Sequence, residues 1–489
     1  MADRHTPFDY QEADIQRMLA EPTRAILLAS EMGRGKTLMA VELVTRLGFE
    51  RVLYIGVKDT FHQWAERLAA QTDGVTNLLR IDATVKGRAN YSLLVNGSPG
   101  HFFVGSQYLT AQDWITVPAM KNGQPVLDKK TGEPTMTRKQ VGVFKKMPPV
   151  HAVVFDEVHV VANRLSKARK TLVTIRTDWK LAMSGTWMGN KFENAWSTSR
   201  WLWPKHVDAS FAGRWKPEWC VTEDVYLPGG KVTQRVTGER TPGLYVSQLP
   251  CYIRAVADEQ APAPRRFMVN LSPAQREQYA FLERELLVWL DSPEGQTAIV
   301  ADFPMVLRTR LRTMALAEMS LQDDGLVGFA GDAVSTKLHA LGNILTEYGN
   351  QPVVIYTHSK RFAKLVTARL NTAGFNAVEW SGDVPSLARD KIKADFLALK
   401  VQYIVAVIAS FSTGLDGFQR VCNKIVWLSE VDDGKLNDQA TARIFRPGMT
   451  TGNGGFEQVM VLAIDTYDVK VFSALVQARL AMRTTLKAA

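Results

Sequence analysis

The sequence predicts an α/β protein built from two parallel sheets whose faces are covered by helices. Short apolar runs of strand length alternate with segments of helical spacing between residues 24 and 183, and the alternation returns between residues 352 and 464. Between these halves the rhythm breaks, which indicates insertions. The chain has 489 residues, 46% hydrophobic and 22% charged, enough for about three average domains or two large ones with insertions.

The first half contains the clearest succession of strands and helices. We expect a strand at residues 24–29, then a glycine-containing turn and a helix at residues 37–47. A second strand at residues 51–56 precedes a helix at residues 60–69. Further apolar runs of strand length lie at residues 101–105, 151–155 and 180–183. We assign residues 1–256 to a first domain.

The second half repeats this organisation after a short connection. Residues 257–266 are Pro-rich and basic at their end, which is typical of a linker. A second domain at residues 267–489 is expected to carry a helical insertion at about residues 271–350 and a closing helix at residues 469–482. Its expected strands lie at residues 352–356, 377–380, 403–408, 424–428 and 459–464.

Two insertions in the first domain differ in character. Residues 117–150 are basic and contain turn signals, so they form either a hairpin that grips DNA or a solvated loop. Residues 187–250 form a Trp-rich protrusion, in which residues 227–231 are expected to be a turn between two strands. Its tryptophans either stack on unpaired bases or lie in a core, and their size favours burial.

The composition limits the class of partner and the compartment. Lysine and arginine number 59 against 49 acidic residues, a net charge of +10, which favours a polyanion such as nucleic acid or an anionic membrane surface. No apolar run is long enough to span a bilayer, and residues 1–10 lack the apolar core of a secretion signal. Three scattered cysteines support neither a disulfide framework nor a zinc site. We expect a soluble protein of a reducing compartment.

The first candidate site is the glycine-containing turn, Ser30-Glu31-Met32-Gly33-Arg34-Gly35-Lys36-Thr37. A phosphate-binding loop needs backbone N–H groups directed into one concavity, glycines where side chains would collide with phosphates, and a helix N-terminus behind them. Gly33 and Gly35 supply the glycines, Lys36 would reach the β- and γ-phosphates, and Thr37 would bind Mg²⁺. The alternative is a glycine turn with a surface lysine, which the flanking strand and helix disfavour.

Two carboxylates follow a later strand. Asp156 and Glu157 end an apolar run, at the edge where open α/β sheets bind ligands. Asp156 suits Mg²⁺, directly or through water, and Glu157 suits the orientation of an attacking water. Alone, such a pair is equally typical of a helix start. Beside the phosphate loop it indicates a site for nucleotide hydrolysis.

A third motif lies far downstream, at Gln439-Ala440-Thr441-Ala442-Arg443-Ile444-Phe445-Arg446-Pro447-Gly448. Arg443 and Arg446 are three residues apart, so a helix would place them on one face. Phosphoryl transfer requires positive charge at the γ-phosphate, and a well-placed arginine contributes about 10³–10⁵ in rate. Without the other motifs, a solvated basic face would be the better interpretation.

In this order the motifs resemble those of helicase superfamily 2, and within it the Swi/Snf-type translocases of double-stranded DNA. In the first half, residues 8–11 resemble the adenine-reading glutamine motif, 30–37 motif I, 52–64 motif Ia, 156–159 motif II and 184–186 motif III. In the second half, residues 353–359 resemble motif IV, 412–417 motif V and 439–448 motif VI. Trp187 stands where the family usually has proline. Residues 211–220 and 252–254 resemble the protrusion of the annealing-helicase branch.

The resemblance implies two RecA-like lobes in tandem, with helical and β-hairpin insertions, that bind ATP and Mg²⁺ between them. The implied catalytic residues are Lys36, Asp156, Glu157, Arg443 and Arg446, and the implied Mg²⁺ ligands are Thr37 and Asp156. The residues implied in ATP binding are Gln11, Gly33, Arg34, Gly35, Lys36, Thr37, Gly414, Asp416 and Gln439. Those implied in coupling hydrolysis to movement are His159, Ser184 and Thr186. Phosphate contacts that position nucleic acid without reading its sequence are implied at Lys58, Ser106, Gln107, Lys360, Arg361, Ser412 and Thr413.

We therefore expect an ATP-dependent helicase or translocase that moves on duplex DNA and remodels, anneals or unwinds branched structures in recombination or repair. A conventional strand-separating helicase on DNA or RNA is the first alternative. A nucleic-acid-binding scaffold with little ATPase activity is the second. The expected form is a monomer without a membrane partner, in the cytoplasm of a bacterium or a virus-infected cell. An unidentified protein partner would direct it to its target.

Overall fold

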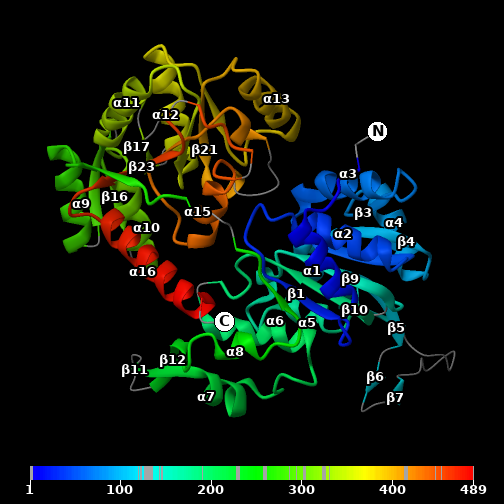
Figure 1. The fold of residues 1–489 in the computed structure, drawn as a ribbon. Coiled ribbons are helices and arrows are strands. Elements are labelled where there is room, and N and C mark those ends of the chain that lie inside the picture. The colour runs from blue at the N-terminus through cyan, green and yellow to red at the C-terminus, as the bar shows by residue number, and fades with distance from the viewer. Residues whose placement is uncertain are drawn as a thin grey trace. The chain divides into compact units, whose positions relative to one another are not determined.

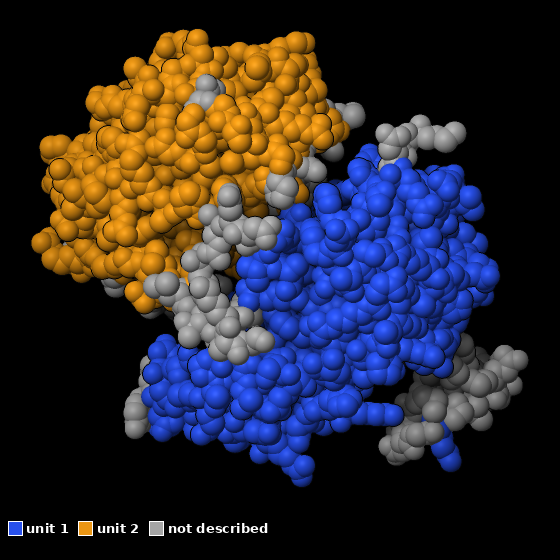
Figure 2. Space-filling model, in the orientation of Figure 1, with its two compact units in different colours: residues 1–257, 484–489 blue, residues 258–483 orange. Residues whose placement is uncertain are grey.

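The computed structural model divides into two compact units, residues 1–257 with 484–489 and residues 258–483 (Figure 2). The residues that the structure describes are 4–118, 120, 121, 124, 125, 136–142, 144, 147–189, 191–226, 232–256, 261–285, 287–292, 295–300, 304–321, 327–329, 331–411, 417–446, 448–452 and 454–487.

Seven parallel strands form the main sheet of the first unit (Figure 1). Their order across the sheet is β13-β1-β10-β9-β2-β4-β3, and every neighbouring pair is parallel. The strand bounds are β1 Ala25–Leu28, β2 Arg51–Gly56, β3 Leu78–Ile81, β4 Gly100–Gly105, β9 Val150–Asp156, β10 Thr177–Met183 and β13 Tyr252–Ile253. Every residue of β1 and β2 is buried, as expected of strands covered on both faces.

Helices cover both faces of this sheet. In Figure 1, α2 and α3 lie on one side of it and α5 and α6 on the other. The helix bounds are α1 Asp9–Leu19, α2 Lys36–Arg46, α3 Phe61–Gln71, α4 Val85–Val95, α5 Lys167–Leu172, α6 Ala195–Leu202, α7 Lys216–Trp219 and α8 Leu244–Ser247. Trp64 and Leu68, both buried, are four residues apart on α3, which is the spacing of one helical face.

The insertions of the first unit contain antiparallel pairs. In the region of the predicted insertion 117–150, β5 Gln112–Pro118 pairs with β8 Met136–Gly142, so the paired segment begins five residues before the predicted start. Within the insertion, β6 Met120–Lys121 pairs with β7 Gln124–Pro125. Residues 119, 122, 123, 126–135, 143, 145 and 146 of this insertion lie outside the described residues. The structure therefore contains a hairpin here, and its contact with DNA stays a prediction.

The Trp-rich protrusion is a packed structure. Trp187, Trp201, Trp203 and Trp215 are each 4% exposed or less, which confirms burial rather than base stacking for these side chains. Strands β11 Cys220–Tyr226 and β12 Val232–Glu239 pair antiparallel, one on each side of the predicted turn. The turn itself, residues 227–231, lies outside the described residues.

Six parallel strands form the main sheet of the second unit, in the order β14-β23-β22-β19-β21-β20. The strand bounds are β14 Arg265–Val269, β19 Val353–Thr357, β20 Ala377–Trp380, β21 Tyr403–Val407, β22 Lys424–Trp427 and β23 Glu457–Ala463. The helix bounds are α9 Pro273–Glu285, α10 Pro304–Met314, α11 Thr336–Tyr348, α12 Lys360–Thr372, α13 Ser386–Leu397, α14 Ile408–Phe411, α15 Gly434–Thr441 and α16 Tyr467–Lys487. Together the two sheets confirm the predicted α/β class with parallel sheets in tandem.

Two expectations for the second half need correction. The predicted linker, residues 257–266, overlaps β14, which begins at Arg265 because its backbone pairs with β23 and its side chain pairs with Glu347 and Glu457. The predicted helical insertion contains α9, α10 and α11 but also two short antiparallel pairs, β15 Leu287–Ser292 with β16 Gly295–Val300 and β17 Ser320–Leu321 with β18 Val327–Gly328. Among the helices that the structure describes, none combines the length and apolar character needed to cross a bilayer.

Candidate functional site

Three strands of the first unit end level with one another, and the candidate site lies where they end. Leu28 of β1 pairs with Met183 of β10, and Met183 pairs with Asp156 of β9. The loops after these strands therefore leave the carboxyl edge of the sheet side by side. These loops carry the predicted phosphate loop, the acidic pair and the Ser184-Gly185-Thr186 segment. Ligands of open parallel sheets bind at this edge.

The phosphate loop has the backbone shape that its glycines predict. Gly33 has φ +82° and Gly35 has φ +74°, and Gly35 is the residue immediately before α2. Glycine adopts this left-handed region without the steric cost that a side chain brings. The side chain of Lys36 folds back over the loop, where its Nζ donates to Ser30 O at 2.8 Å and to Glu31 O at 3.1 Å.

Gln11, the predicted adenine-contacting residue, lies against this loop. It is 3% exposed, and its Nε2 donates to Arg34 O at 3.1 Å and to the Tyr10 hydroxyl at 3.2 Å. A Cβ atom on Gly35 would lie 2.2 Å from that Nε2. The guanidinium of Arg34 stacks over the Tyr10 ring at 5.1 Å. Gln11, Arg34 and Gly35, which the sequence predicts to bind ATP, therefore lie in contact with one another.

The acidic pair is held by neighbours from two other elements. Trp64 of α3 donates from its indole Nε1 to Asp156 Oδ2 at 3.3 Å. Burial and the adjacent charge of Glu157 raise the pKa of Asp156. Glu157 has φ +56°, an uncommon conformation for a residue with a side chain, which indicates backbone strain at this position.

Glu157 forms a small network with two of the predicted coupling residues. Ser184 Oγ donates to Glu157 Oε2 at 2.9 Å, and His159 Nδ1 lies 3.0 Å from the same oxygen and 3.2 Å from Ser184 Oγ. Burial acts to raise the pKa of Glu157, but the hydrogen bonds from His159 and Ser184 and the charge of Lys36 outweigh it and lower that pKa. Glu157 is therefore an ionised carboxylate at neutral pH.

The Ser184-Gly185-Thr186 segment packs directly on the phosphate loop. A Cβ atom on Gly185 would lie 3.3 Å from Ser30 O, so glycine allows the two backbones to approach closely. The Thr186 backbone N–H donates to Ser184 Oγ at 3.2 Å. The structure thus brings together His159, Ser184 and Thr186, as the sequence predicts, while their coupling role stays a prediction.

The chain leaves the first sheet beside the phosphate loop. Ala255 N donates to Ser30 Oγ at 3.0 Å, and Ala255 O accepts from Glu31 N at 3.0 Å. Arg34 Nε donates to Val256 O at 3.0 Å, and Arg254 pairs with the Glu31 carboxylate at 3.5 Å. Backbone and side chains of residues 254–256 are therefore tied to the loop that we expect to hold phosphate.

These residues have the chemistry that ATP and Mg²⁺ require. The donor set combines a lysine, the N-terminus of α2 and two left-handed glycines, which is the composition of a phosphate cradle. Thr37 and Asp156 offer a hydroxyl and a carboxylate, the hard oxygen ligands that Mg²⁺ prefers. The residues present therefore fit both groups: Lys36 and Gly35 would hold phosphate, and Thr37 and Asp156 would hold the metal.

In the second unit, the predicted arginines do not lie on a helix. Gln439 is buried within α15, but α15 ends at Thr441, and Arg443 and Arg446 lie in the consecutive turns that follow. After α15 the backbone N–H groups of Arg443 and Ile444 bond to residues three positions back, Ala440 O and Thr441 O, so the regular helix does not continue through the two arginines. The prediction that a helix aligns the two guanidinium groups is therefore wrong.

The predicted nucleic-acid contacts differ in accessibility. Lys58 and Gln107 are exposed, whereas Ser106 is buried at the start of a short helical turn. Lys360 and Arg361 are exposed at the start of α12, where Lys360 Nζ pairs with Asp383 at 2.6 Å. Ser412, Thr413, Gly414 and Asp416 lie outside the described residues, and their roles stay predictions.

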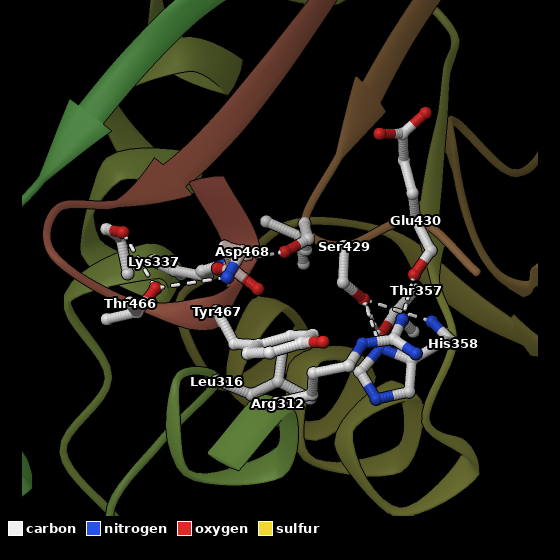
Figure 3. A network of polar contacts seen from close by, with 12 residues as sticks. Arg312, Leu316, Lys337, Thr357, His358, Ser429, Glu430, Thr466, Tyr467 and Asp468 are labelled. Carbon is white, nitrogen blue, oxygen red and sulfur yellow. Dashed lines mark hydrogen bonds and ion pairs between the residues drawn. The ribbon is translucent and has the colours of Figure 1, made fainter. Parts of the chain in front are cut away.

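A buried polar network in the second unit was not predicted (Figure 3). It joins the ends of β19 and β22 to α10, α11 and the start of α16. Its members include Arg312, Lys337, Thr357, His358, Ser429, Glu430, Thr466 and Asp468. Lys337, which is fully buried, forms an ion pair with Asp468 and donates to Leu428 O at 2.6 Å. Trp64 of the first unit was also missed as a partner of Asp156. Polar residues just after two strands were the available signal for the network.

Comparison with known proteins finds one family, two curated relatives and one solved structure that this chain resembles. Residues 10–216 match the family described as the SNF2-related domain. A stretch of 123 residues, 25% of this chain, is 31% identical to 29% of the ATP-dependent RNA helicase RhlB of Pseudomonas syringae pv. tomato. A stretch of 282 residues, 54% of this chain, is 22% identical to 14% of the chromatin-remodeling ATPase INO80 of Cryptococcus neoformans.

The matched part of this chain thus spans less than a third of each of these curated relatives. Among solved structures, the SWI2/SNF2 ATPase core of Sulfolobus solfataricus, in complex with double-stranded DNA, aligns with 100% of this chain and 95% of that chain. The sequence identity is 15% and the TM-score is 0.41.

Proposed function

We propose that this chain, whose residues 10–216 match the SNF2-related domain, hydrolyses ATP and couples the hydrolysis to movement along duplex DNA. The predicted resemblance to Swi/Snf-type members of helicase superfamily 2 is confirmed over this domain. The observation that supports the activity best is the convergence of Lys36, Glu157 and Ser184 at one edge of one sheet. Lys36 is hydrogen-bonded to the phosphate loop, and Ser184 is hydrogen-bonded to Glu157. The charge of Lys36 also lowers the pKa of Glu157, which connects the two sets of contacts.

The residues of the first unit have distinct proposed roles in hydrolysis. Lys36 exchanges the carbonyls of Ser30 and Glu31 for phosphate oxygens, and Thr37 and Asp156 hold Mg²⁺. Bound Mg²⁺ would offset the charge of the phosphates. Glu157, kept ionised by His159 and Ser184, orients the attacking water and accepts its proton.

Arg443 and Arg446 are proposed to supply positive charge to the γ-phosphate. Their support is the match to motif VI and their place after Gln439 of α15. A contribution of about 10³–10⁵ in rate is typical of an arginine in this role.

Duplex DNA is the proposed track. The net charge of +10 favours a polyanion, and the exposed Lys58, Lys360 and Arg361 are suited to phosphate contacts that ignore sequence. The likeness to a chromatin-remodeling ATPase supports DNA, and the likeness to an RNA helicase supports RNA as the alternative. Remodelling or annealing of branched DNA by a cytoplasmic monomer belongs to the same proposal.

ATP turnover measured with separate activators tests the proposal. Single-stranded DNA, blunt duplex DNA, forked DNA and RNA are each added to the full chain, and duplex or forked DNA should stimulate most. Lys36→Ala, Glu157→Gln and Arg446→Ala should each abolish stimulated turnover while the chain stays folded. Lys391→Ala changes an exposed lysine of α13 and serves as the matched control. Full activity of any one of the first three variants would refute the role assigned to that residue.

The same measurements separate the alternatives. Stimulation by RNA alone would favour the RNA helicase. Salt-sensitive binding of DNA without turnover would favour the nucleic-acid-binding scaffold, because counterion release weakens any phosphate-based binding as salt rises. A displacement assay on forked and blunt duplexes distinguishes strand separation from translocation without unwinding.

A further inference from the structure

We propose that Ser429 is a positioning residue that links the nucleic-acid-contacting start of α12 to the arginine-bearing segment after α15. The inference rests on the proposed function, which gives these two segments of the second unit their roles. Ser429 follows β22 and is 4% exposed. It lies at the carboxyl edge of the second sheet, beside the turn that joins β19 to α12 (Figure 3).

Three groups of the β19–α12 turn converge on the Ser429 hydroxyl. The backbone N–H of His358 donates to Ser429 Oγ at 3.1 Å, His358 Nδ1 lies 2.7 Å away, and Thr357 Oγ1 lies 3.2 Å away. In Figure 3, Thr357 and His358 both point toward Ser429. One small side chain therefore contacts two consecutive residues of the turn.

The protonation of His358 fixes the direction of these hydrogen bonds. Burial, together with the charges of Arg312 and Lys337, lowers the pKa of His358 to about 3, so the ring is neutral at physiological pH. A neutral Nδ1 at 2.7 Å from a hydroxyl accepts its proton. Ser429 therefore donates to His358 Nδ1 and accepts from the His358 backbone and from Thr357, which uses the full capacity of a hydroxyl.

From Thr357 the connection continues into α12. Ser359 N donates to Thr357 Oγ1 at 3.3 Å, and Ser359 Oγ caps the helix by accepting from Phe362 N at 3.3 Å. Lys360 and Arg361 are the first two residues of α12. A shift of these two residues against a bound phosphate therefore reaches Ser429 through one turn of backbone.

On its other side, Ser429 begins the loop that leads into α15. Val431 N donates to Asn437 Oδ1 at 3.0 Å, and Asn437 Nδ2 donates back to Val431 O at 2.9 Å. Asn437 is a fully buried residue of α15. Arg479 of α16 pairs with Glu430 at 3.3 Å and with Asp438 of α15 at 2.9 Å. These bonds tie the loop to α15, and Arg443 and Arg446 follow α15 directly in the chain.

The surroundings of Ser429 hold the end of β22 in place. Lys337 donates to Leu428 O, and Arg312 donates to Glu430 O, so the residues before and after Ser429 are fixed by their backbones. Tyr356 joins β19 to α15 inside the core by donating from its hydroxyl to Ala440 O at 2.9 Å. Ser429 adds a second connection, because its hydroxyl is hydrogen-bonded to Thr357 and His358 at the turn that we expect to contact DNA.

The test compares stimulation of ATP turnover in Ser429→Ala, Ser429→Thr and the unaltered chain. Ser429→Ala should keep DNA-free turnover and duplex affinity within about twofold but lower DNA-stimulated turnover by about fivefold or more, the usual lower range of coupling between sites. Ser429→Thr keeps the hydroxyl and should restore stimulation. Ser429 lines a small cavity together with Arg312, Glu430 and Asp468.

Ser335→Ala is the matched control, because Ser335 is a buried serine of the same unit that caps α11 and contacts neither segment. An equal fall in stimulation in Ser335→Ala and Ser429→Ala would overturn the proposal. Thr357→Val removes the Thr357 hydroxyl that contacts Ser429, without changing side-chain size. It should reproduce the loss if Ser429→Ala does not fold.

Hydrogen exchange separates this inference from the proposed function. Added duplex DNA should slow exchange of the backbone amides between residues 431 and 444 in the unaltered chain but not in Ser429→Ala. This measurement needs no ATP hydrolysis. If the chain shows the DNA-dependent slowing but no ATP turnover, the proposed function is refuted and the link through Ser429 is not. Equal slowing in both chains, or no DNA binding by the unaltered chain, would overturn the link through Ser429.

Discussion

Ser184 Oγ lies 2.9 Å from Glu157 Oε2 and donates to it, which joins the end of β10 to the end of β9 at the candidate site. Glu157 holds a left-handed backbone conformation there, with φ +56°. The direction of the Glu157 side chain is set by the strand before it and by the contacts of its carboxylate with Ser184 and His159. His159 Nδ1 contacts the same carboxylate oxygen at 3.0 Å.

We predict that Ser184→Ala lowers kcat for ATP about tenfold while KM for ATP stays within about twofold, because a hydrogen bond to a charged group is lost at the general base and not at the phosphates. Steady-state ATP turnover measures both constants. Ser197→Ala is the control, since Ser197 is a buried serine of the same unit whose hydroxyl donates to Val161 O at 2.6 Å. An increase of KM alone would contradict the role given to Ser184.

Trp64→Phe should raise the Mg²⁺ concentration needed for half-maximal turnover by about tenfold, because the indole N–H that holds Asp156 Oδ2 is lost. The phenyl ring keeps the packing against Tyr54, whose ring centre lies 5.2 Å away. Trp203→Phe removes a comparable indole bond, to Ala25 O at 3.0 Å, and should leave the Mg²⁺ titration unchanged. Identical titrations for the two variants would show that Trp64 does not position the metal ligand.

The buried ion pair of the second unit predicts a large effect on stability. Asp468→Asn leaves the fully buried Lys337 without its counter-ion and should lower the free energy of unfolding by about 3–5 kcal/mol. Asp383→Asn breaks the exposed pair with Lys360 and should cost less than about 1 kcal/mol. Urea unfolding of both variants measures the difference. Similar losses would mean that Lys337 finds another partner when Asp468 is neutral.

Glu430 predicts a pH dependence of stability. Burial and the charge of Asp438 raise its pKa to about 7, against the opposing effect of Arg479 and Arg312. The folded state therefore binds this proton more tightly than the unfolded state does. Its stabilisation is complete below the unfolded pKa of 4.5 and is lost as pH rises through 7. Glu430→Gln should remove this dependence, with a difference from the unaltered chain of up to about 3 kcal/mol between pH 5 and pH 8. Parallel unfolding curves at both pH values would contradict it.

Local patterns were sufficient to predict the parts of the fold that lie in long apolar runs. Strands β2, β9 and β19 were expected within one or two residues of their ends, and each contains four consecutive apolar residues. The strands β3 and β13 were missed for a physical reason. Residues 252–253 form a strand only because β1 lies beside them, and no local signal distinguishes such a pair.

The candidate site likewise contains some residues that the sequence could place and others that it could not. The phosphate loop could be predicted because its glycines, lysine and helix start are consecutive. The placement of Arg443 and Arg446 could not, because Ala440 and Ile444 are apolar and four residues apart, a spacing that predicts a continuing helix where the structure has turns. Of the network around Ser429, only the polar residues that follow two strands could be recognised in the sequence. Their partners could not, since they come from other elements and meet only after the second sheet has formed.

The two-residue strand β13 has a mechanical consequence. Residues 252–253 are the last part of the chain to join the first sheet, and they hold it through only two residue pairs. Just beyond them, Ala255 is bonded to Ser30 and Glu31. Tension on the chain that leaves this unit would act on the two residue pairs between β13 and β1. It would also act on the hydrogen bonds from Ala255 to the loop that we expect to bind phosphate. A force applied there would displace the predicted phosphate loop before it separated any interior strand of the sheet.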